Sequence, residues 1–597
     1  MGDAAMEDME RLNPAVQGPG GGGHAVFAIA EGSSGSAGAY YPGPREARDA
    51  PWWRALAGLV AFCAVMGIVA AAKADKRIVS SPEFLLAPAA CARDGFRPRQ
   101  LLGEFDEYDA QPLEGGTTRS LALWMVLSLL LPLGLGLLWL RAWAEQAHRM
   151  LWFSAGFHVG ATLAAALLLF AAGAAPGGAV LLLLAALVAA LWYMSRAQAE
   201  LCARLLSIAA HGLRASKGLV GLALSLWGLA ALGVALTTVL GAAAYANGAP
   251  VPNPLLTGAR RLVALPANAT AADLPPRGEA YASVAPDRCE LDGVAVPCCV
   301  WRTHPLASAY LVVLAAAAIW GWMTLAAGRR FVIASVVAQF YYAPAGEGPP
   351  PGALHAAVEH ATGPQAGTVA FAGAVLAAVE ALQQAVRAGS RGDGGGSRSG
   401  GAAGAVAALF CGAFRCVASL LLALVEFLCR YSLVWAALTG QGLVDAGRAV
   451  TGLLKRNSLD AATVWWMPGL VVGVTSLAFS LAWGALVYCI VAAATAGDTG
   501  SDGSGAVTTA ALGALAAGVV LQLLGALLLD AVDAVFICYA RDRDAAAAGG
   551  GGGFCAHPEV AEVFDAVAPR PPGVAPGAVV TQPHGGLVYA GRQAGAV

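Results

Sequence analysis

The sequence predicts an all-α, polytopic helical membrane protein of about ten transmembrane helices with disordered terminal tails. Of its 597 residues, 58% are hydrophobic and 12% are charged, whereas about 25% of the residues in a soluble domain are charged. The uncharged stretches are close to the ~20 residues that a helix needs to span the hydrocarbon core. The net charge of -2 and the lack of a basic stripe exclude a nucleic-acid partner.

The span assignment follows the apolar stretches. The strongest are residues 53–72, 120–140, 151–172, 179–194, 219–245, 308–327, 465–494 and 507–536. Two weaker stretches, 367–386 and 416–438, contain polar side chains, which indicates helices that face protein or water rather than lipid. Their polar residues are Glu380, Gln383, Gln384, Glu426 and Arg430.

The domain organisation follows from the same pattern. Residues 1–50 and 544–597 are polar and rich in glycine, which is typical of disordered tails. Between them, residues 51–543 form the predicted transmembrane domain. No cleavable signal peptide is evident, so we expect the first apolar stretch to act as an uncleaved signal-anchor.

The orientation follows from lysine and arginine near the span ends, which favour the cytoplasm. Segments 195–217 and 439–464 carry several basic residues, whereas 173–178 and 495–506 carry none. An even number of spans with both termini cytoplasmic fits these four segments. The linker 387–402 is the exception, because it contains arginines and would lie outside. Segment 196–216 is amphipathic, which predicts an interfacial cytoplasmic helix.

This orientation places the loops 73–118 and 246–305 outside the cell. The second loop contains Asn268 in an Asn-Ala-Thr triplet, which is an N-glycosylation acceptor pattern. The two loops hold an even number of cysteines, as disulfide bonds on an oxidising side require. These candidate disulfide residues are Cys91, Cys289, Cys298 and Cys299.

The sequence offers no catalytic centre, so we expect the protein not to be an enzyme. The motif "HAAVEH" contains His355, Glu359 and His360, but this spacing departs from both zinc-protease patterns. No metal site and no cofactor are predicted.

Ionisable residues within the spans are the remaining polar feature. Such a residue costs about 2.5–3.5 kcal/mol at mid-membrane on insertion scales, so it marks a transport pathway or a buried pair. Glu426 and Arg430 are four residues apart, as in an intrahelical ion pair. Asp533 is either functional or capped by arginines of the tail that follows. Glu380 has no evident partner in its own helix.

A double arginine, Arg329 and Arg330, follows the apolar stretch 308–327. Residues 308–343 would form a helix of ~54 Å, too long for one straight span, so we expect a bend near Gly328. The arginines would then face headgroups, a polar interior or a partner such as Glu380. The aromatic residues at the end of this segment are Phe340, Tyr341 and Tyr342.

Four segments in the C-terminal half, about residues 330–545, resemble the choline transporter-like family. They are "VIASVVAQFYYA" (332–343), "GTVAFAGAVLAAVEAL" (367–382), "EFLCRYSLVWAALTGQGLVDAGRAVTGLLKRN" (426–457) and "AVDAVFICYARD" (531–542). The N-terminal half is similar in layout only. Five residues depart from the family pattern: Glu380, Gln383, Thr439, Leu443 and Val444. The carboxylate of Glu380 adds a negative charge to its helix, which bears on which substrate the protein takes.

The resemblance implies a membrane transporter, glycosylated on its outer surface, for choline or ethanolamine, most simply in the plasma membrane, with an endomembrane as the alternative. A quaternary ammonium is bound by aromatic faces and a carboxylate. The candidate substrate-binding residues are Phe340, Tyr341, Tyr342, Phe371, Glu380 and Asp533, and the candidate gating or charge-pair residues are Arg329, Arg330, Glu426 and Arg430.

Two other functions are open at this point. One is a non-transporting membrane protein that organises lipid composition or trafficking, with membrane lipid as its partner. The other is a pore, which would require rings of like charge from several subunits rather than one carboxylate. Choline uptake by the purified protein separates a carrier from the first alternative.

Overall fold

The computed structural model describes most of the chain between residues 45 and 547. The described ranges are 45–74, 115–216, 218–252, 261–264, 281–284, 289–291, 294–296, 299–343, 348–392, 402–456, 458–495 and 504–547. The tails predicted at 1–50 and 544–597 lie almost entirely outside these ranges, as does most of the loop 73–118. Asn268, Cys91 and Cys298 lie outside the described residues, and no side chain is described for Cys289 or Cys299.

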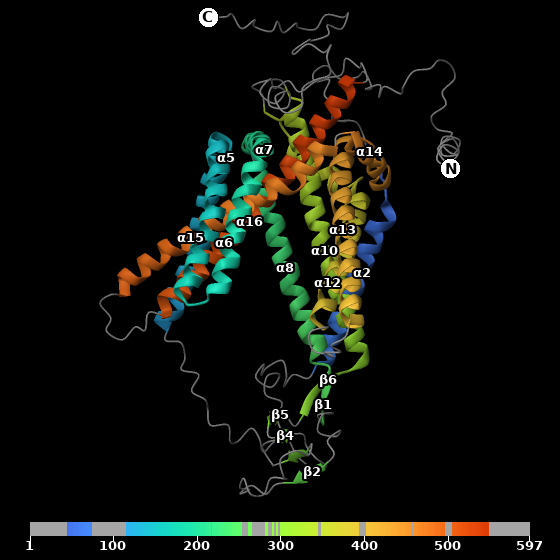
Figure 1. Ribbon diagram of the computed structural model, residues 1–597. Coiled ribbons are helices and arrows are strands. Elements are labelled where there is room, and N and C mark those ends of the chain that lie inside the picture. Colours follow the sequence, from blue (N-terminus) through green and yellow to red (C-terminus); the bar gives the residue numbers. More distant parts are fainter. Residues whose placement is uncertain are drawn as a thin grey trace, which may run out of the picture.

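Long helices make up the membrane domain (Figure 1). Within the described ranges, 9 helices are long and apolar enough to cross a membrane, which confirms the predicted polytopic helical fold. All described helices are α2 (Ala50–Lys73), α5 (Gly115–Ala171), α6 (Ala175–Met194), α7 (Arg196–Ala215), α8 (Leu219–Tyr245), α10 (Pro305–Tyr341), α11 (Ala353–Thr362), α12 (Ala366–Gly392), α13 (Ala402–Thr439), α14 (Leu443–Arg456), α15 (Ser458–Thr495) and α16 (Ser504–Ala547).

Helix α5 explains why this number differs from the predicted ten. The predicted spans 120–140 and 151–172 both fall within its 57 residues. A straight helix of that length would measure ~85 Å, far more than the ~30 Å of a hydrocarbon core. Gln146 interrupts it, with φ -135° and ψ 35°, so α5 consists of two helices joined at a kink. The two predicted spans therefore lie on either side of Gln146.

Short strands lie in the segment between α8 and α10, within the predicted outer loop 246–305. Strand β1 (Gly248–Pro252) pairs antiparallel with β6 (Cys299–Thr303), with Gly248 opposite Thr303. A second sheet has the order β2-β3-β4-β5 and consists of β2 (Arg261–Ala264), β3 (Tyr281–Val284), β4 (Cys289–Leu291) and β5 (Val294–Val296). The β1–β6 ribbon continues directly from α8 and into α10.

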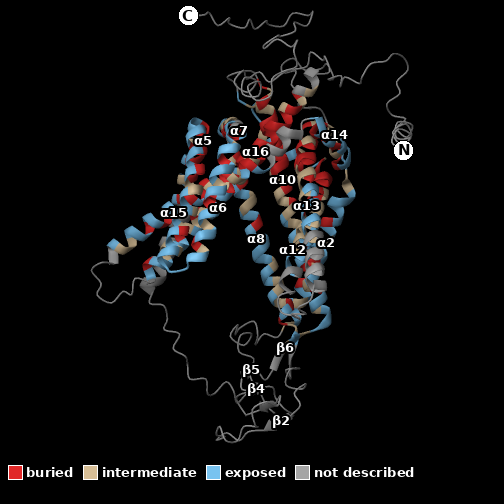
Figure 2. Ribbon diagram, in the orientation of Figure 1, coloured by how far each residue is buried: buried red, intermediate tan, exposed pale blue. Residues whose placement is uncertain are grey.

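The helices pack tightly at one end of the domain and diverge at the other (Figure 1). We call these the α14 end and the strand end, after the elements that lie there. Buried residues concentrate toward the α14 end (Figure 2). In α10, for example, the run from Arg330 to Ala338 is buried, whereas most of the turns before Ala327 are partly or fully exposed.

Helix α7 buries its apolar face in this packed end. It does link α6 to α8, as predicted. However, Leu205, Leu206 and Ala209 are fully buried among residues of the main hydrophobic core, and Ser207 donates a hydrogen bond to the Ala144 carbonyl of α5 at 2.9 Å. The apolar face of the amphipathic pattern is therefore buried against other helices, and the interfacial position stays a prediction.

Helix α10 runs without a break from Pro305 to Tyr341, a length of 37 residues. The predicted bend near Gly328 is therefore wrong. The extra length is accommodated because the second half of the helix is covered by protein instead of lipid. Gly328 itself faces α12, where an added Cβ would lie 3.6 Å from Val369 Cγ1.

Close packing of α10 against α12 depends on a small residue. At Gly373 of α12, an added Cβ would lie 2.7 Å from the Cα and 2.8 Å from the backbone nitrogen of Thr324. At Gly321, one turn earlier on α10, an added Cβ would meet nothing within 4 Å. Small residues at helix interfaces let backbones approach in this way.

We expect Gly373→Ala to destabilise the protein by about 1–3 kcal/mol, because overpacking forces the two backbones apart. Gly321→Ala is the matched control and should leave stability unchanged. The measurement is the thermal midpoint of the detergent-solubilised protein by fluorescence-detected size exclusion. Equal midpoints for the two variants would contradict the close contact of α10 with α12.

Candidate functional site

A cluster of buried charges joins α10, α13 and α16 toward the α14 end. At its centre, Asp530 of α16 has only 2% of its side chain exposed. Arg329 Nε donates to Asp530 Oδ2 at 3.0 Å, and Arg330 Nε donates to Asp530 Oδ1 at 2.9 Å. Both arginines of α10 are therefore held by one carboxylate of α16.

Asp533 forms the second half of the cluster. It lies three residues after Asp530, which places both carboxylates on one face of α16. Tyr431 Oη donates to Asp533 Oδ1 at 3.1 Å, and Arg430 Nη2 donates to Asp533 Oδ2 at 3.4 Å. Arg430 keeps 26% of its side chain exposed, against 10% for Asp533, so Arg430 is the more exposed partner of this pair.

The charges in the cluster nearly balance. Three arginines face two aspartates, and Glu426 lies close enough to interact electrostatically with Arg430. Charges within a bundle persist only when they are paired, because each unpaired ion costs several kcal/mol of desolvation. The cluster therefore ties three helices together by a requirement for neutrality.

One aromatic residue, Tyr431, contacts the Asp533 carboxylate, and two further rings pack against Tyr431. Tyr431 packs edge to face with Phe427, with ring centres 4.6 Å apart, and with Phe536, at 6.0 Å. Tyr431 and Phe536 are buried, whereas Phe427 is only partly buried. A carboxylate among aromatic faces is the environment that a quaternary ammonium requires, since that cation cannot donate hydrogen bonds from its charged head.

The predicted aromatic residues at the end of α10 lie beyond this cluster. Tyr342 Oη donates to Asp542 Oδ1 at 3.1 Å, and its ring packs edge to face with Tyr341 at 4.9 Å. Burial raises the pKa of the Tyr342 hydroxyl well above its ordinary value. Phe340 lies beside Gly212 of α7, where an added Cβ would be 3.1 Å from its ring.

Phe371 lies in a different aromatic group. Its ring stacks on Trp52 of α2 with a centre separation of 4.5 Å and an interplanar angle of 5°. Trp320 meets Trp52 edge to face at 6.3 Å. Rings stacked at this distance leave no space for a cation between them, so one face of Phe371 is closed. The structure does not bring Phe371 together with Asp533.

Two predicted charge partners are wrong. Arg329 and Arg330 pair with Asp530 rather than with Glu380. Of the three surroundings predicted for these arginines, the structure shows the polar interior. Glu380 instead accepts a hydrogen bond from Gln384 at 3.1 Å.

The predicted intrahelical pair of Glu426 and Arg430 also does not form. Arg430 turns to Asp533, and Glu426 accepts from Gln383 Nε2 of α12 at 3.5 Å. The anticipated cap of Asp533 by arginines of the tail is wrong for the same reason, since Arg430 and Tyr431 hold that carboxylate.

Four residues of the site were not among the predicted site residues, namely Asp530, Tyr431, Phe427 and Phe536, the last of which follows Asp533 by three residues. A sequence signal exists for each. Asp530 precedes Asp533 by three residues in an otherwise apolar helix, and Tyr431 and Phe427 flank Arg430 at positions one and three residues away. What the sequence lacks is the partner helix for each of them.

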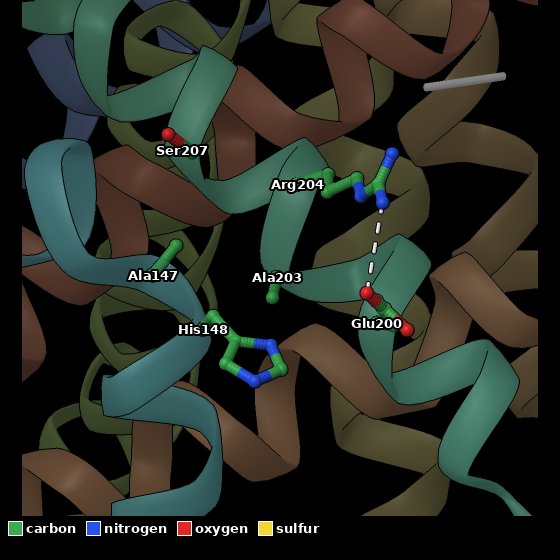
Figure 3. A pocket seen from close by; sticks show the side chains of 6 residues that line it. All are labelled: Ala147, His148, Glu200, Ala203, Arg204 and Ser207. Carbon is green, nitrogen blue, oxygen red and sulfur yellow. Dashed lines mark ion pairs between the residues drawn. The ribbon is translucent and has the colours of Figure 1, made fainter. Parts of the chain in front are cut away.

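A pocket of about 490 Å³ lies elsewhere, between the start of the second half of α5 and α7 (Figure 3). Its lining residues are Ala147, His148, Glu200, Ala203, Arg204 and Ser207. Glu200 and Arg204 form an exposed i,i+4 ion pair at 3.6 Å, which is an ordinary surface feature of a helix. The pocket is separate from the buried charge cluster, since it contains none of that cluster's residues.

A family of known proteins matches the chain. The model of the family described as plasma-membrane choline transporter matches residues 179–544, which is more than half of the chain. The match runs from α6 to α16 and includes every residue of the buried charge cluster. Among curated proteins, no match is found. No group of three or more residues that could hold a metal ion occurs among the residues that the structure describes.

We expect Asp530→Asn to destabilise the protein by about 3–5 kcal/mol, because it leaves two arginines buried without a counter-charge. The matched control is Asp445→Asn, which removes an exposed ion pair with Arg448 and should cost at most about 1 kcal/mol. The measurement is the thermal midpoint in detergent.

A compensating variant tests the cause. Changing Asp530 to Leu together with Arg329 and Arg330 to Met removes all three charges and should recover most of the lost stability. If this triple variant is as unstable as Asp530→Asn, then neutrality is not what the cluster requires.

Proposed function

The chain belongs to the plasma-membrane choline transporter family, and from that premise we propose that it carries choline, or a related small organic cation such as ethanolamine, by alternating access. The family establishes a multi-pass membrane transporter. The choice of cargo, the binding residues and the transport cycle are our proposal. The observation that carries it is the buried Asp533 carboxylate bound by Tyr431, whose ring packs against Phe427 and Phe536.

The chemistry of this site suits a cation that is not a hydrogen-bond donor at its charged end. Asp533 supplies the counter-charge, and the ring of Phe427, which is partly exposed, supplies an aromatic face. A cation over such a face gains about 2 kcal/mol or more when it is desolvated. The Tyr431 hydroxyl group already donates to Asp533 and orients the carboxylate.

Arg430 gives the site a means of coupling to motion. In this structure it holds the position that the cargo cation would take beside Asp533. An arriving cation would replace Arg430 as the partner of the carboxylate, so the carboxylate stays paired while the ion pair between α13 and α16 is lost and Tyr431 alone continues to join them. Transport requires such a coupling, because a ligand shifts a conformational equilibrium only through different contacts in the two states.

The arrangement of the helices supports an assignment of state. Basic residues at the α14 end include Arg448, Lys455 and Arg456 of α14, so we propose that this end faces the cytoplasm. The strand end then faces outward. The helices pack tightly at the α14 end and diverge at the strand end (Figure 1), which supports our proposal of an outward-facing state.

The other predicted residues take places along this route. We propose that Tyr341, Tyr342 and Phe340 line the cytoplasmic exit, since they lie beyond the charge cluster along α10. Glu380 is partly buried on α12 and is a second carboxylate that the cation could meet. Phe371 would contribute its face only after Trp52 moves away from it.

Uptake of radiolabelled choline by proteoliposomes containing the purified protein tests the proposed function. We expect uptake above that of empty liposomes, with competition by excess unlabelled choline, because the carrier has a saturable site. Ethanolamine added as a competitor should reduce uptake less, since its primary amine is more strongly hydrated. Uptake equal to empty liposomes would remove the carrier and favour a protein that organises lipid.

The proposed site is tested with Asp533→Asn and Phe427→Leu. Each should raise the KM for choline roughly 3- to 30-fold, which corresponds to a loss of about 0.7–2 kcal/mol of binding free energy. Asp445→Asn serves as a carboxylate control that should leave KM unchanged. Surface-exposed, correctly folded protein is quantified for each variant. If Glu380→Gln raises KM while Asp533→Asn does not, the cargo binds at α12 instead.

A further inference from the structure

The segment Arg45–Asp49, which we call the arm, precedes α2 and lies against the α14 end of the bundle. Arg45 Nη2 donates a hydrogen bond to the carbonyl oxygen of Ala437 in α13 at 2.8 Å. Its guanidinium carbon also lies 5.8 Å from the ring centre of Phe331 in α10. An arginine from outside the helical bundle thus reaches residues that are fully buried within it.

The groups around the Arg45 guanidinium attract a cation. Helix α13 ends at Thr439, and Gly440 closes it with a positive φ of 75°. The last carbonyl groups of a helix carry partial negative charge, and Ala437 supplies one of them. The face of Phe331 adds cation–π attraction. Neither feature is specific for a guanidinium, so both suit any small organic cation.

The arm is anchored separately by Asp49. Its carboxylate Oδ2 accepts hydrogen bonds from Thr368 Oγ1 of α12 and from the backbone nitrogen of Leu443, each at 3.0 Å. Leu443 is the first residue of α14, where a carboxylate is favoured by the unpaired amides. Asp49 adopts a left-handed conformation with φ 54°, which aspartate tolerates better than most residues. The arm thereby ties α2 to α12 and α14.

The Arg45 position lies on the cytoplasmic side of the charge cluster. Phe331 directly follows Arg330, which pairs with Asp530. Ala437 lies on α13 seven residues after Arg430, which is ~10 Å farther along the helix. A cation that leaves Asp533 toward the α14 end would therefore pass Phe331 and the end of α13.

We propose that Phe331 and the carbonyl end of α13 form a second binding site for a small organic cation at the inner mouth of the transporter, and that Arg45 fills this site in the outward-facing state. The arm acts as an internal competitor: while Arg45 is bound, the exit is closed. A cargo cation that reaches this site displaces Arg45 and releases the arm. The inference rests on the proposed function for its cargo, but not for the contact itself.

Distance measurements between spin labels on the full-length protein test the site. Labels are placed at Ala47 of the arm and Arg448 of α14, both exposed, after the other reactive cysteines are replaced by serine. We expect one narrow distance distribution without ligand. Tetramethylammonium chloride should broaden it, because the probe competes with Arg45, whereas the same concentration of sodium chloride should not.

Three variants test whether Arg45 holds the arm in place. Arg45→Gln should give the broad distribution without any probe. Arg48→Gln is the matched control and should keep the narrow distance distribution, because among the described residues the Arg48 side chain pairs with its neighbour Glu46. Gly367→Ala displaces the arm independently of Arg45, since an added Cβ there would clash with the backbone oxygen atoms of Arg48 and Asp49; it should also be broad.

The rate of choline release at the cytoplasmic face is the functional measurement. Arg45→Gln should increase the rate of choline release at the cytoplasmic face roughly 3- to 10-fold. This range assumes that the arm leaves the exit open for about a third to a tenth of the time in the natural protein, because the variant would leave it open throughout. A narrow distribution in Arg45→Gln overturns the role of the arm. If the distance distribution is broad in Arg45→Gln but the natural protein does not respond to tetramethylammonium, the cation site is overturned.

These outcomes are independent of the proposed cargo. If the arm responds to tetramethylammonium but choline is not transported, the inner site stands and the choline proposal fails. If choline is transported and the arm does not respond, the choline proposal stands and the inner site is overturned.

Discussion

The requirement that buried charge be neutralised governs this structure. Asp530 carries one negative charge in the packed half of the bundle and holds two arginines of α10, while Asp533 holds Arg430 of α13. No one of these helices can keep its charges buried alone, because the desolvation of an unpaired ion exceeds what the apolar packing around it supplies. The relative positions of α10, α13 and α16 are therefore fixed by charge as much as by shape.

The same requirement allows the α14 end to change conformation when one cation replaces another. An ion pair resists partial separation, yet one cation can replace another beside a carboxylate without leaving it unpaired. Arg430 at Asp533 and Arg45 over Phe331 are both cations of the protein placed where an organic cation could bind. In the cycle that we propose, the cargo replaces an arginine at two successive positions. The first exchange removes the ion pair between α13 and α16, and the second removes the contact of the arm with α13.

Much of the fold follows from the sequence because a bilayer leaves few choices for the backbone. Apolar stretches of about 20 residues must be helices there, so the spans could be located from composition, including both halves of α5. Failures occurred where protein instead of lipid covers the helix. Glu426 and Arg430 were paired by their spacing, but a neighbouring helix supplied better partners for both. The break predicted at Gly328 assumed lipid around residues that other helices bury.

The sequence by itself determined the membrane class, the places of the spans, the family resemblance and the presence of Asp533 and the double arginine within apolar surroundings. These are local properties, set by side-chain type and chain length. Only the tertiary structure decided that Asp530 is the partner of Arg329 and Arg330, that Phe371 stacks on Trp52, and that Arg45 reaches the end of α13. The physical reason is that each of these contacts joins helices distant in sequence, and the pairing of helices depends on packing that no single stretch encodes.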